Sequence, residues 1–358
     1  MIRSVCAVCR WVYVLVLLGA GASPFASDVA IRGAGATFPF PIYAKWAAQY
    51  KQETGVDVSY APVGSGAGVD QIERGLVDFG ASDVPMTTAE LQRIGVIQFP
   101  AVIGGVVPVV NVSGIRSGRL RLTGQVLGDI YLGTIRKWND RAIVELNPGL
   151  SLPATNITVV HRSDASGTTF LWTEFLSRSN PQWKSGVGTA KALTWPVGVP
   201  DVGNEGVASS VQRTRDSVGY VEYAYAKAHN LSFASVRNRD GRFVTPGRAA
   251  FEAAALSARW QSVGDLDQLL IDQAGAESWP ITAASFILLR IHPNETARTV
   301  EVLKFFDWAL RRGKQTAADL DYVPMPDSAV GLIGRVWSEQ PRAVSGGVVW
   351  PVGVSPRP

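Results

Sequence analysis

One long extended run constrains this fold more than any other feature of the sequence. Phe99 to Asn111 reads FPAVIGGVVPVVN, interrupted only by Gly104 and Gly105. A run of this length exceeds most strands of globular domains, so it predicts a strand that leaves one domain and enters another. Beyond Pro280 the run ITAASFILL is extended again and predicts the return. Two crossings predict a hinge, and the interface between two domains is a common place for a small ligand.

The remaining sequence alternates short apolar runs with amphipathic stretches, which predicts an α/β fold. Val56 to Ala61 and Phe79 to Ser82 are predicted strands, and Gly68 to Leu76 is a predicted helix between them. A chain of 358 residues is also long for one domain. We therefore expect a bilobal fold of two α/β domains, joined by a two-segment hinge with the ligand cleft between them.

The two crossings predict the domain bounds. Lobe I is expected to be discontinuous, over residues 28–104 and 280–345, and lobe II to comprise residues 105–279. The end of the chain, residues 346–358, is expected to be a loose tail.

The first 26 residues have the pattern of a secretory signal peptide. Arg3 and Arg10 flank the start of an apolar run, and small residues follow it. Cleavage after Ala22 and cleavage after Ala26 both fit. Cysteines occur only before the apolar run, so we expect no lipid anchor and no thiol chemistry in the exported chain. The predicted location is the periplasm.

Charge and histidine spacing narrow the possible functions. The formal charge of +4 falls to about +2 without the two arginines of the signal peptide, and no basic tract with interleaved aromatics occurs, which argues against nucleic acid. His161, His229 and His292 are scattered, without the spacing of metal ligands. We therefore expect no metal and no cofactor.

Four loops combine small residues with hydroxyls or a carboxylate after predicted strands, where α/β sheets bind ligands. Taken singly, each of the first three also fits an ordinary turn or helix cap. The four loops are GAGATFP (33–39), GSGAG (64–68), FGASDVP (79–85) and HRSDASGTTF (161–170).

The fourth loop is the most specific of these signals. Arg162 ends a predicted strand, and Ser166, Gly167 and Thr168 form a predicted helix start. Asp164 lies close enough in sequence to hold the arginine. A guanidinium, free helix amides and two hydroxyls are what a doubly charged oxyanion needs when it loses its water.

In order and spacing, the four loops resemble those of the periplasmic phosphate-binding proteins of high-affinity phosphate ABC importers. The likeness also takes in LGDIYLGTIRKWND, VGYVEYAYAKAHNL and SWPIT. The resemblance implies a solute-binding protein with phosphate dehydrated between its lobes. It further implies that the closed form docks on the transmembrane permease subunits of the importer, which work with a cytoplasmic ATPase. We expect a monomer without enzymatic activity.

The resemblance also implies which residues contact phosphate. Asp83 matches the family's acceptor carboxylate, and Asp164 is expected to support the site through the arginine. The implied phosphate-binding residues are Thr37, Phe38 through its amide, Ser65, Asp83, Arg162, Ser166, Gly167 and Thr168.

Three alternatives remain open on the sequence. A phosphatase could use the same loops, although it would need a nucleophile with a base, or metal ligands. Another oxyanion, such as sulfate or arsenate, could be the ligand on the same fold. A surface-exposed interaction protein could have kept the fold and lost its ligand.

Overall fold

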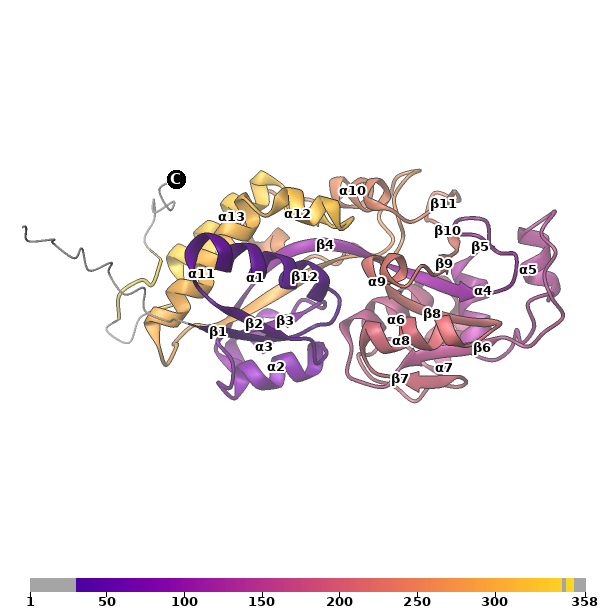
Figure 1. The fold of residues 1–358 in the computed structure, drawn as a ribbon, viewed down its shortest axis with the longest axis horizontal. Coiled ribbons are helices and arrows are strands. Elements are labelled where there is room, and N and C mark those ends of the chain that lie inside the picture. The colour runs from indigo at the N-terminus through magenta and orange to yellow at the C-terminus, as the bar shows by residue number, and fades with distance from the viewer. Residues whose placement is uncertain (1–29, 343–345, 351–358) are drawn as a thin grey trace, which may run out of the picture.

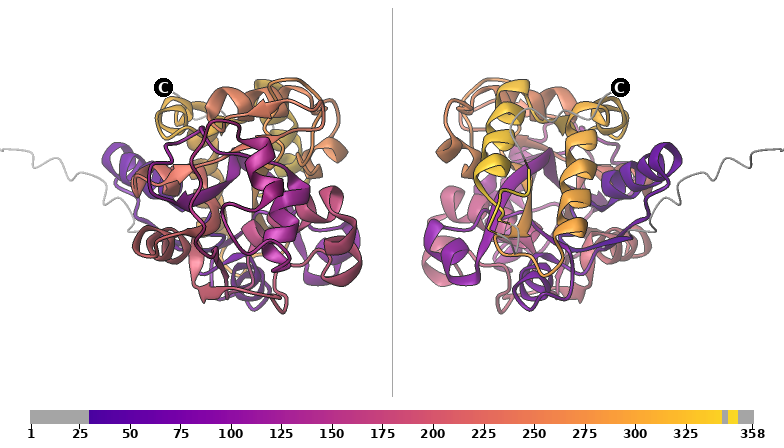
Figure 2. Two further views of the ribbon diagram at one scale, coloured as in Figure 1. Left: turned by 90° about the vertical axis from the view of Figure 1, so that its right-hand side faces the viewer. Right: turned by 90° about the vertical axis from the view of Figure 1, so that its left-hand side faces the viewer.

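The computed structural model describes residues 30–342 and 346–350, which form an α/β protein with two lobes (Figure 1). The N-terminal segment, indigo to purple, and the C-terminal segment, orange to yellow, share one lobe (lobe I), and the middle of the chain, magenta to salmon, forms most of the other (lobe II). Viewed from its end, lobe I shows orange and yellow helices beside the indigo segment (Figure 2, right). The predicted bilobal α/β fold is confirmed.

A single sheet path runs through both lobes, in the order β2-β1-β3-β12-β4-β8-β6-β7. The strands are β1 (Ile31–Gly35), β2 (Val58–Ala61), β3 (Phe79–Ser82), β4 (Val96–Asn111), β5 (Arg121–Leu122), β6 (Thr158–Arg162), β7 (Val199–Asp201), β8 (Ser217–Glu222), β9 (Ser232–Phe233), β10 (Ser235–Arg237), β11 (Phe243–Val244), β12 (Thr282–Arg290) and β13 (Val323–Pro324).

Strand β4 connects the two lobes. Its residues up to Gly105 pair antiparallel with β12, whereas its residues from Val106 onward pair antiparallel with β8. In lobe I, β1 lies between β2 and β3 and is parallel to both. In lobe II, β6 is parallel to β7 and β8. The long extended run of the sequence is thus one strand with a different partner in each lobe.

Helices cover the sheet of each lobe (Figures 1 and 2). Among helices of the described ranges, none combines the length and apolar character needed to cross a membrane. The helices are α1 (Phe40–Thr54), α2 (Ser65–Glu73), α3 (Thr88–Ile94), α4 (Gly124–Tyr131), α5 (Arg141–Leu146), α6 (Gly167–Ser179), α7 (Pro181–Gly186), α8 (Gly203–Arg213), α9 (Tyr223–Ala228), α10 (Arg248–Leu256), α11 (Thr296–Arg311), α12 (Lys314–Asp319) and α13 (Asp327–Glu339), with a 3₁₀ turn, η1 (Val263–Asp267).

Aromatic side chains fill the core of each lobe. In lobe I, the ring of Phe306 from α11 packs edge-on against Phe79 and Phe99, at centroid distances of 5.2 and 5.7 Å. In lobe II, Trp172 of α6 stacks on Tyr220 of β8 at 5.0 Å. Edge-on and stacked aromatic contacts add stability beyond the area they bury, so they fix the helices against the sheet.

Part of the predicted loose tail is packed against lobe I. Val349 and Trp350 are buried, and the ring of Trp350 lies edge-on to Trp337 of α13, with 5.7 Å between centroids. The backbone N–H of Val349 also donates to the carbonyl of Pro341 at 3.2 Å. At Val349 and Trp350 the chain therefore packs against lobe I, because burial of two apolar side chains opposes the entropy of a free end. Residues 351–358 and the predicted signal peptide lie outside the described residues.

Candidate anion-binding site

Three of the four predicted loops meet at the side chain of Ser65. Its Oγ accepts a hydrogen bond from the backbone N–H of Asp83 at 3.3 Å and another from the N–H of Gly167 at 3.1 Å. Ser65 is the first residue of α2, Asp83 directly follows β3, and Gly167 is the first residue of α6. The hydroxyl therefore joins two loops of lobe I to the helix start of lobe II.

The first loop joins this group through Asn204, the second residue of α8. The side-chain amide of Asn204 donates to Oγ1 of Thr37 at 2.7 Å and to Oγ1 of Thr168 at 3.2 Å. Phe38 is fully buried, and its carbonyl accepts from the hydroxyl of Tyr322 at 2.7 Å. All four predicted loops are thus brought together in the structure.

Arg162 is held in a fork by Asp164, as the sequence predicts. Nε of Arg162 donates to one carboxylate oxygen of Asp164 at 2.6 Å, and Nη2 donates to the other. Burial disfavours the charged carboxylate, but the hydrogen bonds and the charge of Arg162 outweigh it and lower the pKa of Asp164. The pair keeps the guanidinium in one orientation.

One nitrogen of this guanidinium has no partner. Arg162 is 2% exposed, and among the residues that the structure describes none accepts a hydrogen bond from its Nη1. A buried donor without an acceptor costs about 1–3 kcal/mol, and more when it is charged, so such a group usually indicates a ligand or water. An anion bound where the four loops meet would accept this hydrogen bond from Nη1 and would also balance the charge of the guanidinium.

The start of α6 contributes further positive potential. Ser166 is its N-cap, with Oγ accepting from the N–H of Thr169 at 3.1 Å. The N–H groups of Gly167 and Thr169 donate to Ser65 and Ser166, and the N–H of Thr168 between them lies at the positive end of the helix dipole, which favours an anion. Ser166 and Thr168 are buried, at 0% and 1% exposure.

Asp83 is the one carboxylate that the predicted contact residues contribute, and it is 1% exposed. Its Oδ1 accepts from the hydroxyl of Ser285 at 2.9 Å. Burial raises the pKa of Asp83 to about 7, although the bond from Ser285 and the charges of Arg162 and Lys191 oppose the rise. A carboxylate in this position can accept a hydrogen bond from an anion that carries a proton, and it disfavours an anion that carries none.

Sequence reasoning missed two residues of this site. Asn204 follows β7 in the segment DVGNEG, which has the same combination of glycine, polar residue and helix start as the four predicted loops, so the signal was present. Ser285 lies inside the apolar strand β12, where no local pattern distinguishes it. Its proximity to Asp83 arises from the pairing of β12 with β3, which is a long-range contact.

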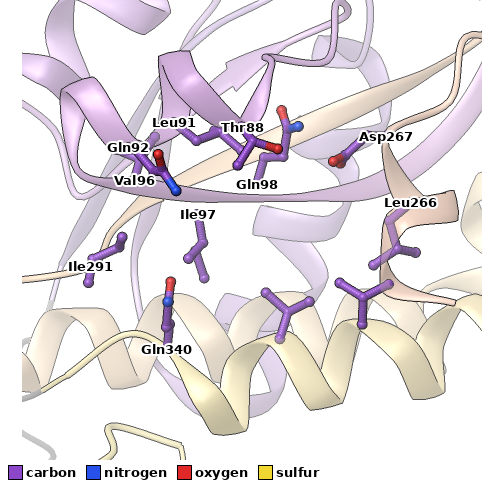
Figure 3. A pocket seen from close by; sticks show the side chains of 12 residues that line it. Thr88, Leu91, Gln92, Val96, Ile97, Gln98, Leu266, Asp267, Ile291 and Gln340 are labelled. Carbon is purple, nitrogen blue, oxygen red and sulfur yellow. The ribbon is translucent and has the colours of Figure 1, made fainter.

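His161 and one separate cavity are not part of the group of predicted contact residues. His161 stacks on Trp195 at 4.7 Å, and within the described ranges no group of three His, Cys, Asp or Glu side chains could hold a metal ion. A cavity of about 230 Å³ lies between α3, β4, η1 and α13, lined by Gln98, Asp267 and Gln340 among others (Figure 3). Burial raises the pKa of Asp267 to about 6. None of the predicted contact residues lines this cavity.

Comparison with known proteins gives consistent results over most of the chain. A family model described as a PBP superfamily domain matches residues 22–312. The phosphate-binding protein PstS of Haemophilus influenzae is 51% identical over 328 residues, covering 92% of this chain and 97% of that relative. The phosphate-binding protein PstS of Pasteurella multocida is 50% identical over 320 residues, covering 89% and 93%.

Solved structures agree on the fold. A phosphate-binding protein from Stenotrophomonas maltophilia superposes with a TM-score of 0.67 at 17% identity, covering 90% of this chain and 99% of that chain. A putative phosphate ABC transporter substrate-binding protein with bound phosphate, from Clostridium perfringens, gives 0.61 at 18% identity, covering 83% and 100%. The family model and the relatives at about 50% identity show that the chain belongs to the PBP superfamily and, within it, to the family of phosphate-binding proteins named PstS.

Proposed function

We propose that this protein binds inorganic phosphate between its lobes and delivers it to the membrane permease of a phosphate ABC importer. The relatives of this chain are named as phosphate-binding proteins, and one structural neighbour is described as a putative phosphate ABC transporter substrate-binding protein with bound phosphate. The protein acts as a monomer in the periplasm, after cleavage of its signal peptide and without a lipid anchor. It binds and releases its ligand without catalysis, and the importer's ATPase supplies the energy.

The unpaired Nη1 of Arg162 is the observation that carries this proposal. It is the charged donor of a set that includes the hydroxyls of Thr37, Ser65 and Thr168 and the backbone N–H of Thr168 at the start of α6. Hydrogen-bond donors from both lobes around one guanidinium suit an oxyanion with several charged oxygens.

Asp83 selects phosphate from among such oxyanions. Phosphate at neutral pH still carries hydrogen, which it can donate to the carboxylate, whereas sulfate carries none. Sulfate would therefore leave a buried charged acceptor unpaired, at a cost of about 1–3 kcal/mol or more. Arsenate is protonated as phosphate is, so we expect it to bind as well.

The permease recognises the form of the protein in which the lobes have closed around phosphate. We propose the hinge at the two crossings, with lobe I over residues 28–104 and 280–345 and lobe II over residues 105–279. The change of partner within β4, between Gly105 and Val106, supports the first crossing. The contacts of Ser65 and Asn204 across the lobes support a closed form that needs donors from both.

Isothermal titration of the mature chain with phosphate, sulfate and arsenate tests the proposal. The expected result is one phosphate per chain, similar behaviour of arsenate and much weaker binding of sulfate. Sulfate bound as tightly as phosphate would contradict it, as would no phosphate binding at all. Because Ser65 lies beside Asp83, turnover of p-nitrophenyl phosphate is measured in parallel, and catalysis would favour the phosphatase alternative.

Gly167→Ala is expected to weaken phosphate binding by opening the interface between the loops. A Cβ on Gly167 would lie 2.5 Å from Oγ of Ser65 and 2.8 Å from Oδ2 of Asp83, closer than side chains approach one another. Relief of such an overlap costs about 1–3 kcal/mol, so we expect roughly 5- to 150-fold weaker binding by calorimetry.

Gly334→Ala is the matched control for this substitution, because a Cβ at this helical glycine of α13 meets nothing within 4 Å. We expect unchanged phosphate affinity in this control. Equal affinities of the Gly167→Ala variant and wild type would show that the closed contacts around Ser65 are not needed for binding.

Acidic pH is expected to reduce the discrimination against sulfate. Since the pKa of Asp83 is raised to about 7, the side chain is neutral below that pH and can donate to a sulfate oxygen. Above it the side chain is ionised, and the apparent sulfate affinity should fall about tenfold per pH unit. Titrations from about pH 5 to about pH 9 measure this slope. A sulfate affinity that is flat over this range would contradict the role of Asp83.

A further inference from the structure

Asn204 lies between the lobes at the start of α8. Gly203, directly before it, has a φ of 70°, a left-handed conformation that favours glycine. This turn directs the chain from the end of β7 into the helix and places the Asn204 side chain against Thr37. Asn204 is fully buried, at 0% exposure, so each of its polar atoms needs a partner.

The orientation of the Asn204 amide is fixed by the backbone. Its Oδ1 accepts a hydrogen bond from the N–H of Glu222 at 2.9 Å. Because a backbone N–H can only donate, the oxygen of the amide must face Glu222, and its NH₂ group must face the other way. The two hydrogens of that group then point at Thr37 and Thr168.

These contacts determine what the threonine hydroxyls can do. Oγ1 of Thr37 accepts two hydrogen bonds from Asn204, one from the side-chain Nδ2 at 2.7 Å and one from the backbone N–H at 3.3 Å. A hydroxyl has two acceptor lone pairs and one hydrogen, so both lone pairs of Thr37 are in use and its hydrogen remains to be donated. Oγ1 of Thr168 accepts from the same NH₂ at 3.2 Å, which favours donation there too.

We propose that Asn204 is a positioning residue, which makes the hydroxyls of Thr37 and Thr168 donors toward the bound anion. The inference rests on the proposed function, because it concerns the same phosphate site. One threonine comes from each lobe, so the donor arrangement is complete only when the lobes are closed. Thr37 then offers no acceptor to phosphate, and the oxygen that carries hydrogen must face Asp83.

A double-mutant cycle tests this role by calorimetry with inorganic phosphate. Asn204→Ala is measured in the wild-type chain and in a chain that also carries Thr37→Val and Thr168→Val. We expect Asn204→Ala to weaken binding about 10- to 100-fold in the wild-type chain, and less than about threefold where the hydroxyls are absent. The same loss in both chains would overturn the proposal, because it would show that Asn204 does not act through these hydroxyls.

Asn111→Ala is the matched control, because Asn111 also contacts α8. Its Nδ2 donates to the carbonyls of Val211 at 3.0 Å and Gln212 at 2.9 Å, at the other end of that helix. We expect a lower melting temperature with unchanged phosphate affinity. If Asn111→Ala weakens phosphate binding as much as Asn204→Ala does, the effect belongs to the packing of α8 and the proposal fails.

Asn204→Asp keeps the test decisive if the alanine variant does not fold. This substitution preserves shape and leaves an acceptor for the N–H of Glu222, but it replaces the NH₂ group by an acceptor. The hydroxyls of Thr37 and Thr168 should then turn toward the new carboxylate, and phosphate binding should weaken by about 100-fold or more. Wild-type affinity in this variant would overturn the inference. Failure of the wild-type chain itself to bind phosphate would instead overturn the proposed function.

Discussion

Asp83→Asn is expected to convert a phosphate-selective protein into one that also binds sulfate. The amide keeps the shape of the carboxylate but carries hydrogen, so it can donate to a sulfate oxygen. Ser285 holds Oδ1 of Asp83 at 2.9 Å, which leaves the other carboxylate oxygen to face the guest. Removing an unpaired buried charge should improve sulfate affinity by about 10- to 100-fold or more, whereas phosphate affinity should change less.

Asp307→Asn is the control for this experiment. Asp307 is also buried, at 3% exposure, but it lies on α11 and pairs with Arg311 at 2.7 Å. We expect the ratio of phosphate to sulfate affinity to stay at the wild-type value in this variant. Calorimetry that finds an unchanged ratio in Asp83→Asn would contradict the assigned role of Asp83.

Arg162→Lys is expected to cause the largest loss of phosphate affinity. The guanidinium of Arg162 pairs with the carboxylate of Asp164, and its Nη1 has no hydrogen-bond acceptor among the described residues. The side chain is 1% exposed. A lysine keeps the charge but has a single ammonium group, which cannot pair with Asp164 and reach the anion in the same geometry. Disrupting a buried, hydrogen-bonded charge pair costs about 2–5 kcal/mol, or roughly 30- to several thousand-fold in affinity.

The affinity lost in Arg162→Lys should be similar for phosphate and arsenate, because the guanidinium neutralises the charge of the anion and does not distinguish its protonation state. Arg178→Lys is the matched control in the same lobe. Arg178 is 40% exposed and pairs with Glu174 on α6, so we expect no effect on binding. Phosphate affinity within about threefold of wild type in Arg162→Lys would show that the guanidinium does not contact the anion.

Local sequence patterns predicted the long connecting strand and several strands and helices around it, because a buried strand or an amphipathic helix leaves a periodic signature. The predicted strand over 79–82 coincides with β3, and the long extended run is β4. The predicted helix start at Gly68 was three residues late. Gly64 has a φ of 94°, which lets the chain turn and begin α2 at Ser65. This shift places Ser65 at the free-amide end of the helix.

The candidate site was predicted as four separate loops, and their convergence depends on contacts that local patterns do not encode. Ser65 meets Gly167 across 102 positions in the chain, and Ser285 meets Asp83 across 202. The first contact depends on closure of the lobes, and the second depends on the pairing of β12 with β3 in lobe I. Residues whose chemistry is visible only after such pairing, such as Ser285, were therefore missed.

A crystal structure of the mature chain grown with excess phosphate tests the central claim most directly. The account predicts one phosphate at the start of α6, with one oxygen within hydrogen-bond distance of Nη1 of Arg162 and another within that distance of the Asp83 carboxylate. Phosphate bound elsewhere, or bound with Asp83 turned away from it, would contradict the account.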